Sequence, residues 1–195
     1  MKSIIMLLAA LALATASITA QKVEDQIWGI SVGISPIILY NETALSDKIS
    51  LRSEVNVGFG WTSGNAYTGG SEWAFIPAIV VEPRYYYNLE KRFNKGKITR
   101  NNSGNYLSLG LGYQPGLAIG TENTYVHPAL SFIPRFGVKR SIGKHFTYET
   151  NFGLGYAWVF KKLEYPNWNT GAIEEYKETD HGVTIGFQLT IGYVF

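Results

Sequence analysis

The stretch that decides the fold lies at the C-terminus, where residues 183–195 read VTIGFQLTIGYVF. Every second residue from Val183 to Phe195 is large and apolar, and most residues between them are Gly, Thr or Gln. Side chains of a β-strand point alternately to its two faces. This stretch therefore predicts a strand with one apolar face and one face of small or polar residues.

The same alternation recurs along most of the chain. Seven segments carry it strongly, namely residues 27–39, 49–61, 73–88, 105–114, 124–139, 145–160 and 182–195. Because Pro36 has no backbone N–H to donate, we divide the first segment into a hairpin of 26–35 and 37–45, with one long strand as the alternative. The count is then eight strands. Residues 161–181 show no alternation and are expected to form a loop.

Composition limits the possible functions. A chain of 195 residues suits one domain, and an aromatic content of 14% is far too high for a disordered chain. The absence of Cys excludes disulfides, thiolate catalysis and thiolate metal sites. A formal charge of +2 without a long basic stripe argues against nucleic acid as a partner. We expect no cofactor and no bound metal.

Residues 1–20 have the features of a secretory signal peptide. Lys2 gives a short cationic start, Ile4 to Ala14 form an apolar run of 11 residues, and small residues lead to Ala20. A membrane-spanning helix needs about 20 apolar residues, so this run is too short to be one. We expect cleavage after Ala20, which leaves residues 21–195 as a single exported domain.

The direction of the apolar face separates two kinds of β-barrel. In a soluble lipocalin-like barrel it lines a pocket, whereas in a membrane barrel it faces lipid. The other face here consists mainly of Gly, Ser, Ala, Thr and Asn, which fit a narrow interior, whereas a water-facing sheet would carry many Lys and Glu. Aromatic residues gather at the strand ends, as in membrane-interface girdles; they are Trp28, Trp61, Trp73, Tyr85, Tyr87, Tyr113, Trp158, Tyr193 and Phe195. We predict an all-β fold, an eight-stranded antiparallel up-and-down transmembrane β-barrel.

Two motifs resemble a known family. Phe195, preceded at alternate positions by Tyr193, Ile191, Leu189 and Phe187, resembles the signal that the outer-membrane barrel assembly machinery recognises. The chain is similar to small eight-stranded outer-membrane proteins of the OmpA/OmpX type, and residues 83–89 with the basic turn after them resemble barrel domains common in Bacteroidota. The resemblance implies the outer membrane of a Gram-negative bacterium, with lipid and the assembly machinery as partners. It implies little about activity, because such families include adhesins, structural barrels and enzymes. We expect a monomer.

The inward positions near one rim carry most of the charge. They are Glu42, Arg52, Glu54, Glu82, Arg84, Arg135 and Glu149, with Lys139 at the edge of this layer. Charges in a narrow interior are costly unless paired, so we expect a salt-bridged plug that does not conduct ions. A gated proton or ion path is the alternative. Small residues above the layer indicate a narrow interior, or else a cleft for an acyl chain or small apolar ligand.

The exposed connections are the candidates for contact with partners. We expect residues 161–180 outside the cell, where Tyr165, Trp168 and Tyr176 could contact a protein or glycan. The basic segment 89–104 is expected at the periplasmic end as a solvated polar turn, with attraction to anionic lipid as the alternative.

Catalytic candidates are few. His127 and His181 are expected near the outer rim, with Asp180 beside His181, but no hydrolase or metalloprotease motif accompanies them. We therefore assign no catalytic residue. The sequence favours a structural or adhesive outer-membrane protein, and the alternatives are a lipid-modifying enzyme and a barrel that binds a small apolar ligand.

Overall fold

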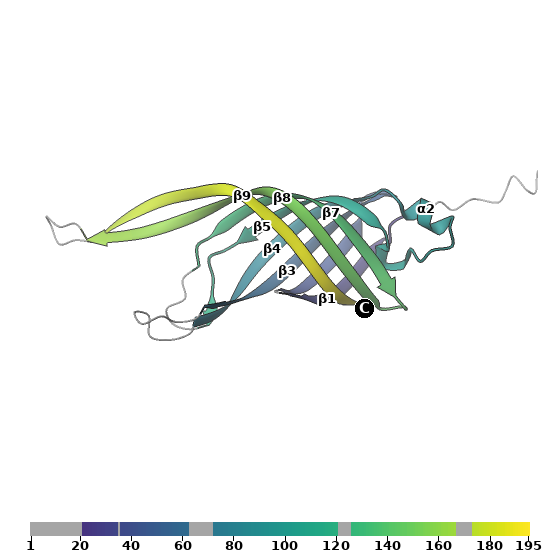
Figure 1. Cartoon of the computed structure of the whole chain (residues 1–195), viewed down its shortest axis with the longest axis horizontal. Coiled ribbons are helices and arrows are strands. Elements are labelled where there is room, and N and C mark those ends of the chain that lie inside the picture. Colours follow the sequence, from purple (N-terminus) through teal and green to yellow (C-terminus); the bar gives the residue numbers. More distant parts are fainter. Residues whose placement is uncertain (1–20, 35, 63–71, 121–125, 167–172) are drawn as a thin grey trace, which may run out of the picture.

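The computed structural model describes residues 21–34, 36–62, 72–120, 126–166 and 173–195. These residues form one antiparallel sheet of strongly tilted strands (Figure 1). Residues 1–20, for which the sequence predicts a signal peptide, lie outside the described residues.

The eight main strands close into a ring. The sheet contains nine strands among the described residues, and all except the two-residue β6 belong to the ring: β1 (Gln26–Gly33), β2 (Ile37–Ala44), β3 (Ile49–Thr62), β4 (Glu72–Tyr86), β5 (Asn105–Gln114), β6 (Ile119–Gly120), β7 (Ala129–Ile142), β8 (Phe146–Pro166) and β9 (Ile173–Val194). Each main strand pairs with its neighbours in sequence, and β1 pairs with β9 from Gly29 opposite Val194 to Gly33 opposite Thr190. The short β6 pairs with β4. The prediction of eight antiparallel strands is confirmed.

The expected hairpin near Pro36 is also confirmed. β1 ends at Gly33 and β2 begins at Ile37, and the Gly33 N–H donates to the Pro36 carbonyl oxygen at 3.1 Å. β1 and β2 have eight residues each and are the shortest strands of the ring, whereas β9 has 22. The wall of the ring is therefore lower at this hairpin than at its neighbours.

The expectation of a loop over residues 161–181 is wrong. β8 and β9 remain paired from Lys161 opposite Glu178 to Pro166 opposite Ile173, and this two-stranded ribbon projects far beyond the other strands (Figure 1). Outside the ring neither face of the ribbon has a core to cover, so pairing can continue without apolar alternation. We call residues 161–166 and 173–181 the ribbon, and this side of the ring the ribbon end.

The opposite side of the ring is closed by residues 89–104 and is here called the α2 end. This segment contains helix α2 (Leu89–Phe93) and the short helix η1 (Arg100–Asn102). Glu90, Lys91 and Lys95 are exposed, as expected for a solvated polar turn, whereas Leu89, Asn101 and Asn102 are buried. No helix in the described ranges is long and apolar enough to cross a membrane.

The chain just before β1 packs against this closing segment. Val23 is fully buried against Tyr86, Leu89 and Tyr106. The Glu24 N–H donates to Asn102 Oδ1 at 2.8 Å, and the Asn101 N–H donates to a Glu24 carboxylate oxygen at 2.7 Å. These contacts bring residues 23–24 and 101–102 together at the α2 end of the charge layer. Two hydrogen bonds from backbone N–H groups thus hold the closing segment to the chain before β1.

The apolar face of the strands points outward, and the charged face points inward. Each of the eight main strands exposes large apolar side chains; examples are Trp28, Ile30, Ile37, Leu39, Val55, Phe59, Phe75, Ile79, Leu107, Leu111, Leu130, Phe132, Phe152, Leu154, Ile185 and Phe187. The buried side chains include Glu42, Arg52, Glu82 and Arg84. This distribution is the reverse of that in a water-soluble protein.

The small inward residues make room for large side chains on neighbouring strands. A Cβ at Gly137 would lie 2.1 Å from the Tyr106 ring, and a Cβ at Gly110 would lie 2.9 Å from the Arg135 guanidinium carbon. At Gly153 a Cβ would collide with the Pro134 carbonyl oxygen and come within 2.8 Å of both Ile133 and Arg135. Close packing of large side chains against glycine therefore explains the small residues at these positions, in agreement with the narrow interior that the sequence indicates.

The packing over Gly137 leads to a prediction about folding. Gly137→Ala should lower the free energy of unfolding by about 1–3 kcal/mol, because the added methyl group forces the buried Tyr106 ring to move. Gly182→Ala is the matched control, since no atom lies within 4 Å of a Cβ built there. Urea unfolding of the purified protein, followed by tryptophan fluorescence, measures both variants. Equal midpoints for the two would contradict the packing argument.

Candidate functional site

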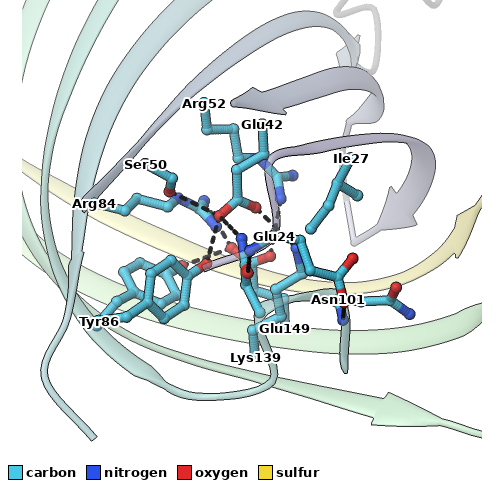
Figure 2. Close-up of polar contacts among 12 residues, drawn as sticks. Glu24, Ile27, Glu42, Ser50, Arg52, Arg84, Tyr86, Asn101, Lys139 and Glu149 are labelled. Atoms are coloured by element: carbon cyan, nitrogen blue, oxygen red, sulfur yellow. Dashed lines mark hydrogen bonds and ion pairs between the residues drawn. The ribbon is translucent and has the colours of Figure 1, made fainter. Parts of the chain in front are cut away.

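The charged residues singled out in the sequence lie together inside the ring, close to the α2 end. Figure 2 shows Glu42, Arg52, Arg84 and Glu149 converging with Lys139. The whole charge layer comprises Glu42, Glu54, Glu82, Glu149, Arg52, Arg84, Arg135 and Lys139. Of these eight side chains only that of Arg135 retains appreciable exposure, at 15%. Four acids thus face four bases in a space shielded from water.

Glu149, on β8, is the centre of this layer. One of its carboxylate oxygens lies 3.1 Å from Arg52 Nη1, and the other lies 2.8 Å from Arg84 Nη2. The Tyr106 hydroxyl donates to the second oxygen at 2.6 Å. Two guanidinium groups and one phenol therefore share a single carboxylate, and such charge-assisted hydrogen bonds are about twice as strong as neutral ones.

Glu42, on β2, links the layer to the closing segment. Its Oε2 accepts from Lys139 Nζ at 2.9 Å, and its Oε1 accepts from Ser50, Tyr86 and Asn102, each at 2.8 Å. The Asn102 side chain comes from the segment 89–104, so that segment is fixed to the interior by a hydrogen bond to a buried charge.

The remaining pairs complete the layer within the walls of β3, β4 and β7. Arg52 Nε lies 2.5 Å from Glu54, and Arg84 Nη2 lies 2.9 Å from Glu82. Glu82 also accepts from Ser108 Oγ and lies 3.6 Å from Arg135 Nη1. Every acid of the layer thus has at least one cationic partner, as burial of a carboxylate requires.

Several of these pairs cross the ring from one side to the other. The Arg52–Glu149 pair joins β3 to β8, and the Lys139–Glu42 pair joins β7 to β2. In the order of strands around the ring, each of these two pairs connects strands on opposite sides. The layer therefore fills the cross-section of the ring and holds opposite walls at a fixed distance.

Three tyrosines and an asparagine belong to the site but were not identified from the sequence. The Arg52 guanidinium carbon lies 3.7 Å from the centre of the Tyr40 ring, and that of Arg84 lies 4.3 Å from the centre of the Tyr106 ring. Ring faces attract cations, and the attraction is stronger away from water. The alternation does place Tyr40 and Glu42 on the same face, so strand parity could have indicated this tyrosine. Asn102 lies in a connection and has no such signal.

Asp180 and His181, the catalytic candidates considered above, lie outside the charge layer and have separate partners. Asp180 and His181 are adjacent in β9 and therefore point to opposite faces. Asp180 pairs with Lys161, and this hydrogen bond raises the pKa of the lysine, whereas His181 Nδ1 lies 2.5 Å from the Tyr156 hydroxyl on the outer face. His127 accepts a hydrogen bond at its carbonyl oxygen from Gln114. Within the described ranges, no three His, Asp or Glu side chains are grouped so that they could hold a metal ion.

The other predicted site residues fall into two groups. Phe187, Leu189, Ile191, Tyr193 and Phe195, the expected assembly signal, are all exposed on the outer face at the C-terminal end. Of the expected loop contacts, Tyr176 is 53% exposed on the ribbon, Tyr165 belongs to its other strand, and Trp168 lies outside the described residues. The ribbon therefore presents at least one large aromatic side chain.

A scan of the chain against protein-family models and a search of the curated proteins found no match.

The charge layer leads to a prediction about stability. Glu149→Gln should lower the free energy of unfolding by about 3–5 kcal/mol, because two buried guanidinium groups then share too little negative charge. Glu175→Gln is the matched control, because it removes the exposed ion pair with Lys162 and should cost less than about 1 kcal/mol. Urea unfolding of the purified protein measures the free energy of unfolding of both variants. A Glu149→Gln variant as stable as the control would show that the layer does not hold the ring together.

Proposed function

We propose that this protein is an integral outer-membrane β-barrel of the OmpA/OmpX type, with a structural or adhesive role carried by the ribbon. The observation that carries the membrane part is the belt of exposed apolar side chains around the whole ring. A docking site for another protein would be a patch on one side, whereas a bilayer surrounds its protein completely. Since all eight strands contribute to the belt, lipid is the environment that suits it best.

The apolar groove and the aromatic residues of the outer surface agree with a lipid environment. An apolar groove of about 520 Å³ runs over β4, β5, β7 and β8, where Ile79, Tyr113, Phe132 and Trp158 line its sides. Aromatic residues lie at both ends of the belt, for example Trp61 and Trp73 toward the ribbon end and Tyr85 and Tyr193 toward the α2 end. Aromatic rings are preferred at the boundary between hydrocarbon and headgroups.

The charge layer suits a barrel that does not act as an open pore. Its ion pairs cross the interior, and residues 89–104 lie beneath it. An ion that entered would have to break buried pairs, each of which is costly to open. We therefore favour a structural role in the membrane over transport. The ion pairs also argue against an apolar ligand bound inside the ring at the charge layer.

The ribbon is the element that suits an adhesive role. It extends beyond the belt and carries Lys161, Lys162, Lys177, Glu175 and Glu178 together with the exposed Tyr176. Beyond Phe160 the edge of β8 that faces away from β9 has no strand partner among the described residues. Such an edge can pair with an extended peptide, and aromatic residues are favoured in binding surfaces.

The membrane proposal predicts the behaviour of the isolated protein. The full chain, expressed in a Gram-negative host, should fractionate with the outer membrane and need detergent for extraction, because the apolar belt must stay covered. The unboiled extract should migrate faster in a denaturing gel than the boiled sample, since the closed ring resists unfolding. Recovery of folded protein in the soluble fraction without detergent would refute the proposal.

The adhesive proposal predicts that binding and folding can be separated. Deletion of residues 163–178 should leave the gel shift unchanged, because the ring pairs without them, and should abolish retention of expressing cells on immobilised glycoprotein. Lys95→Gln, at the opposite end, is the matched control and should retain binding. Cells that adhere equally with and without the ribbon would leave only the structural role.

A further inference from the structure

A second polar site lies at the α2 end, on the outside of the ring. Helix α2, the residues that follow it and the end of β7 enclose a pocket of about 510 Å³. Five cations line it, namely Lys91, Arg92, Lys95, Lys97 and Arg140. Tyr87, which is exposed, forms part of the same wall.

The positive charge of this pocket is not neutralised by the protein. None of the five cations forms an ion pair with a described residue, whereas every cation of the charge layer has a carboxylate partner. Glu90, the one acid on α2, pairs with Lys48 at 3.5 Å. Like charges repel at close range, so a cluster of this kind is stabilised by an anion from outside.

The two guanidinium groups are held in place rather than free in solvent. Arg92 Nη2 donates to the Ile98 carbonyl oxygen at 3.0 Å, and Arg140 Nη1 donates to the Lys139 carbonyl oxygen at 2.7 Å. Arg140 Nη2 also donates to Asn105 Oδ1 at 2.5 Å, and Asn105 Nδ2 in turn donates to the Tyr87 hydroxyl at 3.2 Å. Tyr87 and Arg140 are thus linked through Asn105, and Arg92 Nε is buried without a hydrogen-bond partner among the described residues.

We propose that this pocket binds the phosphate group of an anionic phospholipid in the leaflet at the α2 end. Fixed guanidinium groups and flexible lysines are the side chains that recognise phosphate oxygens. The volume exceeds that of a bare phosphate and accommodates a headgroup. Tyr87 lies beside the outward-facing Tyr85 and thus at the edge of the apolar belt, so the pocket lies at the depth of the headgroups. This inference rests on the proposed membrane location.

The test uses the full chain without its residues 1–20, folded in neutral detergent, with the gel shift as proof of folding. Native mass spectrometry then measures retained lipid after addition of phosphatidylglycerol or of phosphatidylcholine. The folded protein should retain phosphatidylglycerol at least about tenfold more strongly, since each basic residue near a lipid surface contributes roughly a fivefold preference. Inorganic phosphate at millimolar concentration should not displace the lipid, because the acyl chains add contacts with the belt.

Two variants localise the effect. Arg92→Gln with Arg140→Gln should abolish the preference, and Lys91→Gln with Lys95→Gln should reduce it severalfold without touching the hydrogen bonds that hold the two arginines. Lys162→Gln with Lys177→Gln, on the ribbon, makes the same change in charge and should retain it.

Three outcomes overturn the inference. Equal retention of the two lipids by folded protein, an undiminished preference in both pocket variants, or complete displacement by inorganic phosphate would each exclude a phospholipid site there. Failure of the unmodified chain to fold in detergent or lipid would instead count against the membrane proposal itself.

Discussion

The structure depends on one carboxylate. Glu149 lies where two guanidinium groups from β3 and β4 and a phenol from β5 meet, and it reaches them from β8 across the ring. A buried charge with partners on opposite walls fixes the width of the interior, since neither wall can move without leaving a charge unpaired. An interior of this width cannot hold bulky side chains from every strand. Glycine therefore occupies the positions that face Tyr106 and Arg135, namely Gly137 and Gly110.

The inner and outer surfaces meet opposite requirements with the same backbone. Inside, each acid has a cationic partner, and Glu42, Glu82 and Glu149 also accept hydrogen bonds from hydroxyl groups. Outside, the same strands expose mainly isoleucine, leucine, phenylalanine and tryptophan. Alternation with a period of two allows one strand to serve both surfaces, and closure of the ring leaves few backbone groups of the wall without a partner. The organisation is therefore that of a protein whose solvent outside is apolar, as we propose.

Alternation in the sequence was sufficient to predict the number of strands, the hairpin at Pro36 and the set of inward charges, because each strand must separate its apolar and polar side chains. Where that requirement ends, prediction failed. The ribbon has no face to bury, so its pairing beyond Lys161 left no periodic signal. Residues 101 and 102 are both asparagine in the left-handed region, a conformation that depends on their contacts with Glu24 and Glu42 rather than on local pattern. Tyr86 and Tyr106 were not predicted as part of the interior, because only the charged and the small inward residues were interpreted, although strand parity turns both tyrosines inward.

The unequal height of the wall has a mechanical consequence. β1 and β2 stop at their tight turn, while β9 on one side and β3 on the other continue past it. β9 before Thr190 and β3 after Val57 run past the β1–β2 turn. Their backbone amides and carbonyls on the side of this turn have no strand partner among the described residues. Fewer inter-strand hydrogen bonds hold the wall beside this turn than where both neighbouring strands continue, so local opening there should cost less free energy than opening at the charge layer.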